Sequence, residues 1–128
     1  MKSLTLRLLE HTFSIHSLPP NSDIPASVLS AKIFFIAKTN DEVSIVAPQS
    51  VEIASDDVET DWQALEVVGP LDFTLTGIMS SISTVLANEK ISIFAISTFD
   101  TDYVLVKNNT LDAAITALRA NKYQVLTK

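Results

Sequence analysis

The chain has 128 residues and a mass of 14.0 kDa, which is enough for one ordinary domain or two very small ones and excludes a large multidomain enzyme. Hydrophobic residues make up 47% of it and charged residues 19%, which indicates a folded core, and the absence of cysteine excludes disulfides, zinc-thiolate sites and a cysteine nucleophile. A formal net charge of -6 argues against binding to nucleic acid or to an anionic membrane surface.

The first part of the chain predicts a strand, a short helix and a hairpin. Residues 4–15 are a strand candidate, and Pro19-Pro20 breaks the chain after it. Residues 24–30 are expected to form a short helix with Pro25 in its first turn, where proline is tolerated. Apolar residues in 33–46 then favour two short strands.

The middle of the chain is strongly acidic. Residues 41–61 contain seven acidic residues and no basic one. Within this segment, residues 48–60 are predicted to be an acidic connector, with one strand at residues 51–53.

The C-terminal half predicts six elements in the order strand, helix, strand, strand, helix, strand. They are expected at residues 62–69, 75–89, 91–98, 103–107, 111–118 and 123–126. Thr110 is a candidate cap for the second helix. This βαββαβ order is typical of ferredoxin-like folds.

The N-terminal half resembles an incomplete copy of the C-terminal half. Shifting residues 33–46 by 60 positions onto 93–106 gives four identities without a gap. The copy lacks the second helix. We therefore predict an α+β fold of two ferredoxin-like βαββαβ modules packed into one body, residues 1–58 being degenerate and residues 59–128 complete.

The two glycines of the chain mark the first candidate site. They bracket Gly69-Pro-Leu-Asp-Phe-Thr-Leu-Thr-Gly77, which leads from a predicted strand into a predicted helix. Free N–H groups at a helix start favour an anion such as a carboxylate, and Gly77 has no side chain to block its approach. The same residues would also serve as a plain turn and helix start, with Asp72 or Thr74 as the cap.

Acidic residues in the predicted hairpin turn form the second candidate site. Asp100 and Asp102 could attract an ammonium or guanidinium group, and they could equally be turn formers. Two carboxylates alone make a poor metal site, and we predict none. His11 and His16 are expected on opposite faces of one strand, so they cannot share a metal, and no nucleophilic triad is recognisable.

The segments Gly69–Ile78 and Ile91–Val106 resemble the ACT-domain family. More narrowly, the chain is similar to small bacterial tandem-ACT proteins related to the CASTOR arginine sensors and to the regulatory domains of aspartate kinases. The likeness is strongest over residues 62–121. It extends to Leu18-Pro-Pro, Ile24-Pro-Ala and Asp41-Glu-Val-Ser-Ile-Val46.

The resemblance implies a module that binds a small ligand, usually an amino acid, at an interface between two ACT modules. It also implies that the chain has no catalysis of its own and needs no cofactor. The residues that correspond to the family's ligand site are Asp72, Phe73, Thr74, Leu75, Thr76, Gly77, Ile78, Ser97, Thr98, Phe99, Asp100 and Asp102.

Three functions are consistent with the sequence. The first is an amino-acid-binding regulatory module, and the alternative is a ligand-free adaptor for protein assembly. The third, an enzyme that uses Asp100 and Asp102, lacks an adjacent base or nucleophile. We expect a homodimer or a protein partner, and no contact with nucleic acid or membrane. We also expect a cytoplasmic location, because the N-terminal residues lack the apolar core of a signal peptide.

Overall fold

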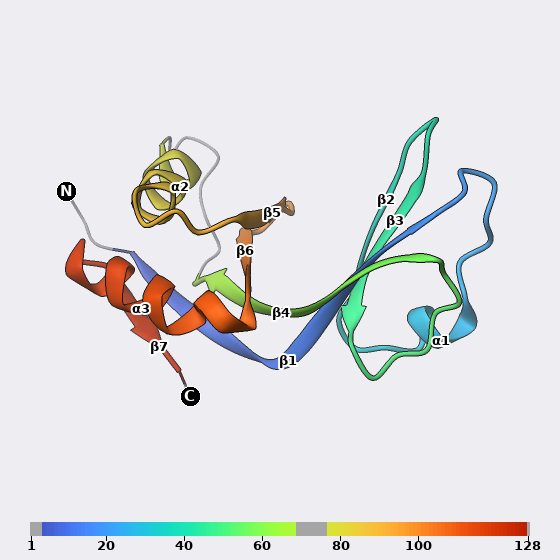
Figure 1. Ribbon diagram of the computed structural model, residues 1–128, viewed down its shortest axis with the longest axis horizontal. Helices are drawn as coiled ribbons and strands as arrows, with labels where there is room; N and C mark the ends of the chain where they lie inside the picture. The colour runs from blue at the N-terminus through green and yellow to red at the C-terminus, as the bar shows by residue number, and fades with distance from the viewer. Residues whose placement is uncertain (1–3, 69–76, 128) are drawn as a thin grey trace. The chain divides into compact units, whose positions relative to one another are not determined.

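The computed structural model describes residues 4–68 and 77–127, and these residues form two compact units. Unit 1 contains residues 4–10 and 63–127, and unit 2 is His11–Trp62. Two long strands, β1 (Thr5–Leu18) and β4 (Asp57–Val67), contribute residues to both units (Figure 1). The module boundary that we predicted after residue 58 therefore falls inside a continuous strand.

Unit 1 has the predicted βαββαβ order. After β4 it continues through α2 (Ile78–Asn88), β5 (Ile93–Ser97), β6 (Asp102–Lys107), a 3-10 turn (Asn108–Thr110), α3 (Leu111–Ala120) and β7 (Gln124–Leu126). The strands lie in the order β5-β6-β4-β1, and β7 pairs in parallel with β1. The first half of β1 thus lies between β4 and β7, an addition to the ferredoxin-like pattern that the sequence did not predict.

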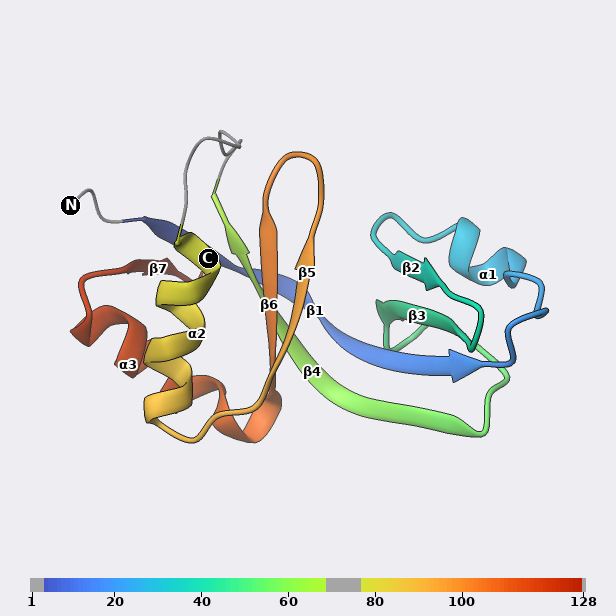
Figure 2. The ribbon, with the colours of Figure 1, turned by 90° about the horizontal axis from the view of Figure 1, so that it is seen from above.

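The core of unit 1 lies between its sheet and its two longer helices. Helix α2 buries Ile82, Val85 and Leu86, because these residues recur at helical spacing on one face. Helix α3 contributes a similar stripe, and both pack against the same sheet face (Figure 2). The strand residues buried in this core include Leu6, Leu65, Val67, Val104, Val106 and Val125.

Unit 2 is smaller and has one short helix. It contains the second half of β1, α1 (Ala26–Leu29), β2 (Phe35–Lys38), β3 (Val43–Pro48) and the beginning of β4. The strand order is β2-β3-β1-β4. One buried cluster of this unit contains Leu18, Val28, Val43, Ile45 and Ala47, and Phe13 and Val46 are also buried.

Several predicted elements of unit 2 differ from the structure. The strand that we predicted at residues 51–53 is wrong, because Val51 and Ile53 lie in an irregular segment and pack on the core from there. The acidic connector ends earlier than predicted, since β4 already begins at Asp57. Helix α1 is a single turn that begins at Ala26. Pro25 is its N-cap residue, whereas we predicted that Pro25 would lie inside the first turn.

None of the helices in the described part of the chain is long and apolar enough to cross a membrane.

Candidate functional site

The β5–β6 turn of unit 1 brings one group of the predicted site residues together. The N–H of Thr98 donates to the carbonyl of Thr101 at 2.8 Å, and the N–H of Thr101 donates to Thr98 Oγ1 at 3.3 Å. Just below the turn, Ser97 Oγ donates to Asp102 Oδ1 at 2.6 Å across a strand pair. The predicted residues from Ser97 to Asp102 are therefore neighbours in one closed turn.

This turn is attached to the end of β4. Thr101 is buried, and its Oγ1 donates to the carbonyl oxygen of Val67 at 2.5 Å. The turn and the N-terminal end of α2 lie at the same end of unit 1 (Figure 2). Asp100 is exposed, and Phe99 keeps 81% of its surface accessible. The acidic turn thus lies where the chain leaves β4 towards α2.

The second group of predicted site residues is only partly described. Asp72, Phe73, Thr74, Leu75 and Thr76 lie outside the described residues. Gly77 is the N-cap residue of α2, and Ile78 is the first helical residue and packs against the core of unit 1. The helix therefore begins three residues later than predicted, and its N-cap residue is Gly77. The cap candidates Asp72 and Thr74 lie outside the described residues.

Gly77 has a left-handed backbone with a φ of 77°. A Cβ atom placed on it would meet nothing within 4 Å. Glycine is therefore favoured at this position by the backbone conformation, and among the described residues a steric clash with a side chain does not require it. Among the described residues, no side chain caps the start of α2, because its N-cap residue is a glycine.

Sequence reasoning missed a polar cluster on the sheet of unit 1. Tyr103 donates from its hydroxyl to Glu66 Oε2 at 3.2 Å, and Arg7 Nη1 lies 3.6 Å from Glu66 Oε1. Burial, and then the charge and hydrogen bond of Glu66, raise the pKa of Tyr103. The three residues come from three strands, so no local spacing in the sequence could have revealed their contact.

Unit 2 contains a second turn of the same kind. The N–H of Thr39 donates to the carbonyl of Glu42 at 2.9 Å, and Thr39 Oγ1 accepts from the N–H groups of Asp41 and Glu42. The side chain of Glu42 in turn accepts a hydrogen bond of 2.8 Å from Ser17 Oγ, near the end of β1. Each unit therefore attaches a hairpin turn to the end of the strand that precedes its first helix.

The strand pairs that close the two turns test the offset of the predicted repeat. The pair Lys38 and Val43 closes one turn, and Ser97 and Asp102 close the other, a constant difference of 59 positions. The offset of 60 that we predicted is therefore one residue too long. With the corrected offset, Thr39 corresponds to Thr98 and Asp41 to Asp100.

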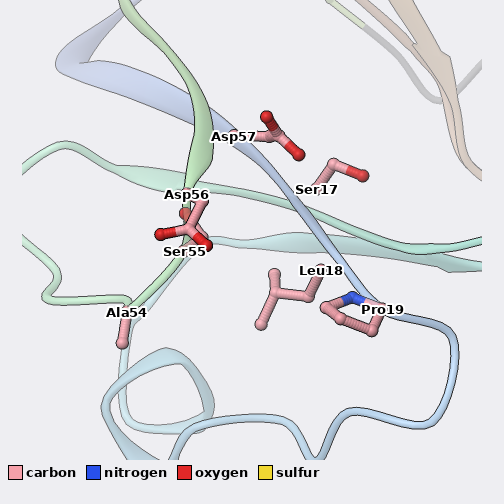
Figure 3. A pocket seen from close by; sticks show the side chains of 7 residues that line it. All are labelled: Ser17, Leu18, Pro19, Ala54, Ser55, Asp56 and Asp57. Carbon is pink, nitrogen blue, oxygen red and sulfur yellow. The ribbon is translucent and has the colours of Figure 1, made fainter.

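A pocket lies in unit 2 at the corner where β1 ends. Its volume is about 320 Å³, which is within the usual range for small-molecule sites. Figure 3 shows its lining residues, which come from the end of β1 and from the segment that enters β4: Ser17, Leu18, Pro19, Ala54, Ser55, Asp56 and Asp57. Sequence reasoning did not single out this pocket, because its two walls are 35 or more residues apart.

A buried histidine connects the two walls of the pocket. His16 Nδ1 and Ser55 Oγ are 2.6 Å apart, and burial lowers the pKa of His16. His11, five residues earlier, makes an edge-on ring contact with Phe13. No group of three or more metal-ligating side chains occurs within residues 4–68 and 77–127.

Comparisons with known proteins agree with this architecture. A family model described as ACT domain matches residues 57–120. A crystal structure of an Agobacterium tumefaciens protein is 31% identical, with a TM-score of 0.91 over 100% of this chain and 96% of that one. The regulatory subunit of aspartate kinase from Thermus flavus is 12% identical, with a TM-score of 0.64 over 93% and 98% of the two chains. A Vibrio cholerae protein of unknown function is 17% identical, with a TM-score of 0.68 over 92% and 89%.

Proposed function

This chain belongs to the ACT-domain family, and from that membership we propose that it is a regulatory module that binds an amino acid and has no catalytic activity. The ligand carboxylate would accept hydrogen bonds from N–H groups at the start of α2, near Gly77 and Ile78. The ligand ammonium would lie against the acidic turn that holds Asp100 and Asp102. The module would act in the cytoplasm and transmit its state to a partner.

The observation that carries this proposal is the hydrogen bond from Thr101 to Val67. It fixes the acidic turn at the end of β4, the same end of unit 1 at which α2 begins. A site that offers N–H groups on one side and carboxylates on the other is complementary to the two charged ends of a free amino acid. The hydrogen bonds of the turn hold its residues in place before the ligand binds, which reduces the conformational entropy lost on binding.

We further propose that a second copy of the chain completes the site. The turn residues Phe99 and Asp100 are exposed, so a bound amino acid would be only partly enclosed by one copy. A ligand that contacts both copies would bind the dimer more tightly than the monomer, and it would therefore stabilise the dimer. This coupling would make the module a sensor.

Calorimetry and thermal unfolding with the twenty amino acids test the proposal. A ligand present at about ten times its Kd would stabilise the protein by about 1.4 kcal/mol and raise the melting temperature by about 5 °C. Asp100→Asn should weaken this effect, whereas Asp41→Asn at the equivalent turn of unit 2 is the matched control. Absence of stabilisation by every amino acid at millimolar concentration would contradict the proposal.

The alternative function, an assembly adaptor without a ligand, is favoured by one observation. Phe99 is 81% exposed at the tip of a hairpin, where an aromatic side chain is well placed to contact another protein. Under this alternative, Phe99→Ser would weaken association without any effect on amino-acid affinity. Sedimentation at several protein concentrations, with and without amino acids, separates the two functions.

A further inference from the structure

We propose that the pocket of unit 2 is a separate binding site for a small organic cation, an ammonium group carried on a short hydrocarbon chain. The site would be distinct from the amino-acid site proposed above, because it lies in unit 2 and shares no residue with that site. The proposal stands on the geometry of the pocket alone. It would remain valid if unit 1 bound no amino acid.

The first argument is the shape and lining of the pocket. Leu18, Pro19 and Ala54 give it an apolar wall, and its volume of about 320 Å³ accommodates a chain of a few carbon atoms. Asp56 and Asp57 also line the pocket, and their carboxylates point in different directions, that of Asp57 toward the side of Ser17 (Figure 3). An apolar wall beside two carboxylates is complementary to a ligand with a hydrocarbon part and a positive charge.

The second argument is that these two carboxylates are available. Both side chains are exposed, and among the described residues neither has a hydrogen-bond or ion-pair partner. Lys38 Nζ donates to the backbone carbonyls of Pro20 at 2.7 Å and Thr39 at 3.4 Å, and no ion pair between Lys38 and either carboxylate occurs among the described residues. The segment 41–61 itself supplies no basic residue.

The third argument is that both walls are held in place before any ligand binds. On one wall, Ser17 Oγ donates to Glu42, and on the other, Ser55 is bonded to the buried His16. The hydroxyl groups are therefore engaged with the protein, and the two free carboxylates are left as the charged groups of the opening. A site held in this way loses little conformational entropy when a ligand binds.

The pocket of unit 2 lies at the corner that corresponds to the proposed amino-acid site of unit 1. It lies at the end of β1, beside the turn that Glu42 attaches to that strand. The internal repeat relates this corner to the end of β4 in unit 1, where Thr101 attaches the corresponding turn. Each unit thus has a candidate site at the same corner of its fold.

Three probes with the same four-carbon chain test the charge requirement: n-butylammonium, n-butanol and butyrate. Backbone amide signals of the full chain are followed by two-dimensional NMR during each titration. Butylammonium should shift the signals of Ser17 and residues 54–57 with a Kd on the order of millimolar, as expected for a ligand of this size. Butanol and butyrate should leave these signals in place at the same concentrations.

The double variant Asp56→Asn/Asp57→Asn should weaken butylammonium binding about fivefold or more, because exposed ion pairs each contribute a modest amount. The variant Asp23→Asn/Asp41→Asn changes the net charge equally on exposed residues of unit 2 outside the pocket, and should bind as the unmodified protein does. Raising the salt concentration should also weaken binding.

Two outcomes would overturn the cation site. One is equal binding of butanol and butylammonium at the pocket signals, and the other is unchanged affinity in the Asp56 and Asp57 double variant. Butylammonium has no carboxylate, so it does not report on the amino-acid site of unit 1. Failure of amino acids to shift the signals of Gly77 and Ser97 would contradict the proposed function while leaving this result intact.

Discussion

The side-chain amide of Gln49 contacts Asp61 at two points. Gln49 Oε1 accepts from the N–H of Asp61 at 2.7 Å, and Gln49 Nε2 donates to Asp61 Oδ1 at 3.1 Å. Asp61 lies within β4 and has a φ of 67°, a left-handed conformation that is unfavourable for residues other than glycine. The amide of Gln49 therefore stabilises an irregularity in the middle of a long strand.

Gln49→Ala should lower the free energy of unfolding by about 1 kcal/mol, because two hydrogen bonds to the exposed Asp61 and a longer one from Ser14 are lost. When residue 61 is already glycine (Asp61→Gly), Gln49→Ala should lower the free energy of unfolding by less. Glycine adopts a positive φ without a supporting hydrogen bond. Urea unfolding of the two single variants and the double variant measures this coupling. Strictly additive costs would show that Gln49 does not support the backbone of Asp61.

Thr101→Val should reduce stability by about 1 to 2 kcal/mol. Valine has nearly the same shape, but it leaves the buried carbonyl of Val67 without its hydrogen bond. Thr116→Val is the control, because Thr116 is exposed on α3 and should change stability by less than about 0.5 kcal/mol. Equal effects of the two substitutions would mean that the turn is not held by the bond to Val67.

Gly77→Ala should cost about 1 kcal/mol although there is room for the added methyl group. The cause is the positive φ, so Gly77→Asn should be less harmful, since asparagine tolerates this conformation better. Thermal unfolding without ligand measures the backbone effect. Calorimetry with the best amino-acid ligand then shows whether binding falls by more than the loss of stability explains.

The stability of the protein should decrease as the pH falls below about 6.5, the ordinary value for histidine. The folded state holds the pKa of His16 below this value, so the unfolded chain takes up a proton first and folding is disfavoured. His16→Gln should flatten the pH dependence of stability between about pH 7 and 5. The control His11→Gln, in the same strand, should leave unchanged the part of the pH dependence of stability that comes from His16.

The ionisation of Tyr103 should occur above the ordinary pKa of 10.0. Folding raises the pKa of Tyr103, so the neutral phenol stabilises the folded state fully below pH 10. This stabilisation is lost as the pH rises through the pKa of Tyr103 in the folded state. Glu66→Gln should move the pKa of Tyr103 down, because it removes the negative charge that opposes the phenolate. Absorbance titration of the phenolate measures this shift, and an unchanged pKa would contradict the contribution of Glu66.

The elements of unit 1 were predictable from the sequence because their signals are local. The apolar spacing of α2 and the β-rich runs of β5 and β6 are strong patterns, and all three elements are confirmed. The start of α2 was misplaced because Asp72 and Thr74 are good capping residues, whereas Gly77 takes the N-cap position through its backbone conformation.

The register of the internal repeat could not be obtained from apolar identities. Isoleucine and valine are interchangeable along a strand, so a shift of one residue still produces matches such as Ile33 with Ile93. The turns are more specific, since Thr39 and Thr98 make equivalent hydrogen bonds. Contacts between distant segments, such as those that form the pocket of unit 2, leave no local pattern at all.

The placement of β1 between β4 and β7 has a consequence for synthesis of the protein on the ribosome. Thr5 pairs with Gln124, so β1 cannot complete its pairing in unit 1 until β7, far later in the sequence, has been made. Until then, the sheet of unit 1 has an open edge beside Leu6, and its core cannot close. Unit 1 can therefore complete its folding only after β7 has been made, whereas all strands of unit 2 have already been made by residue 67.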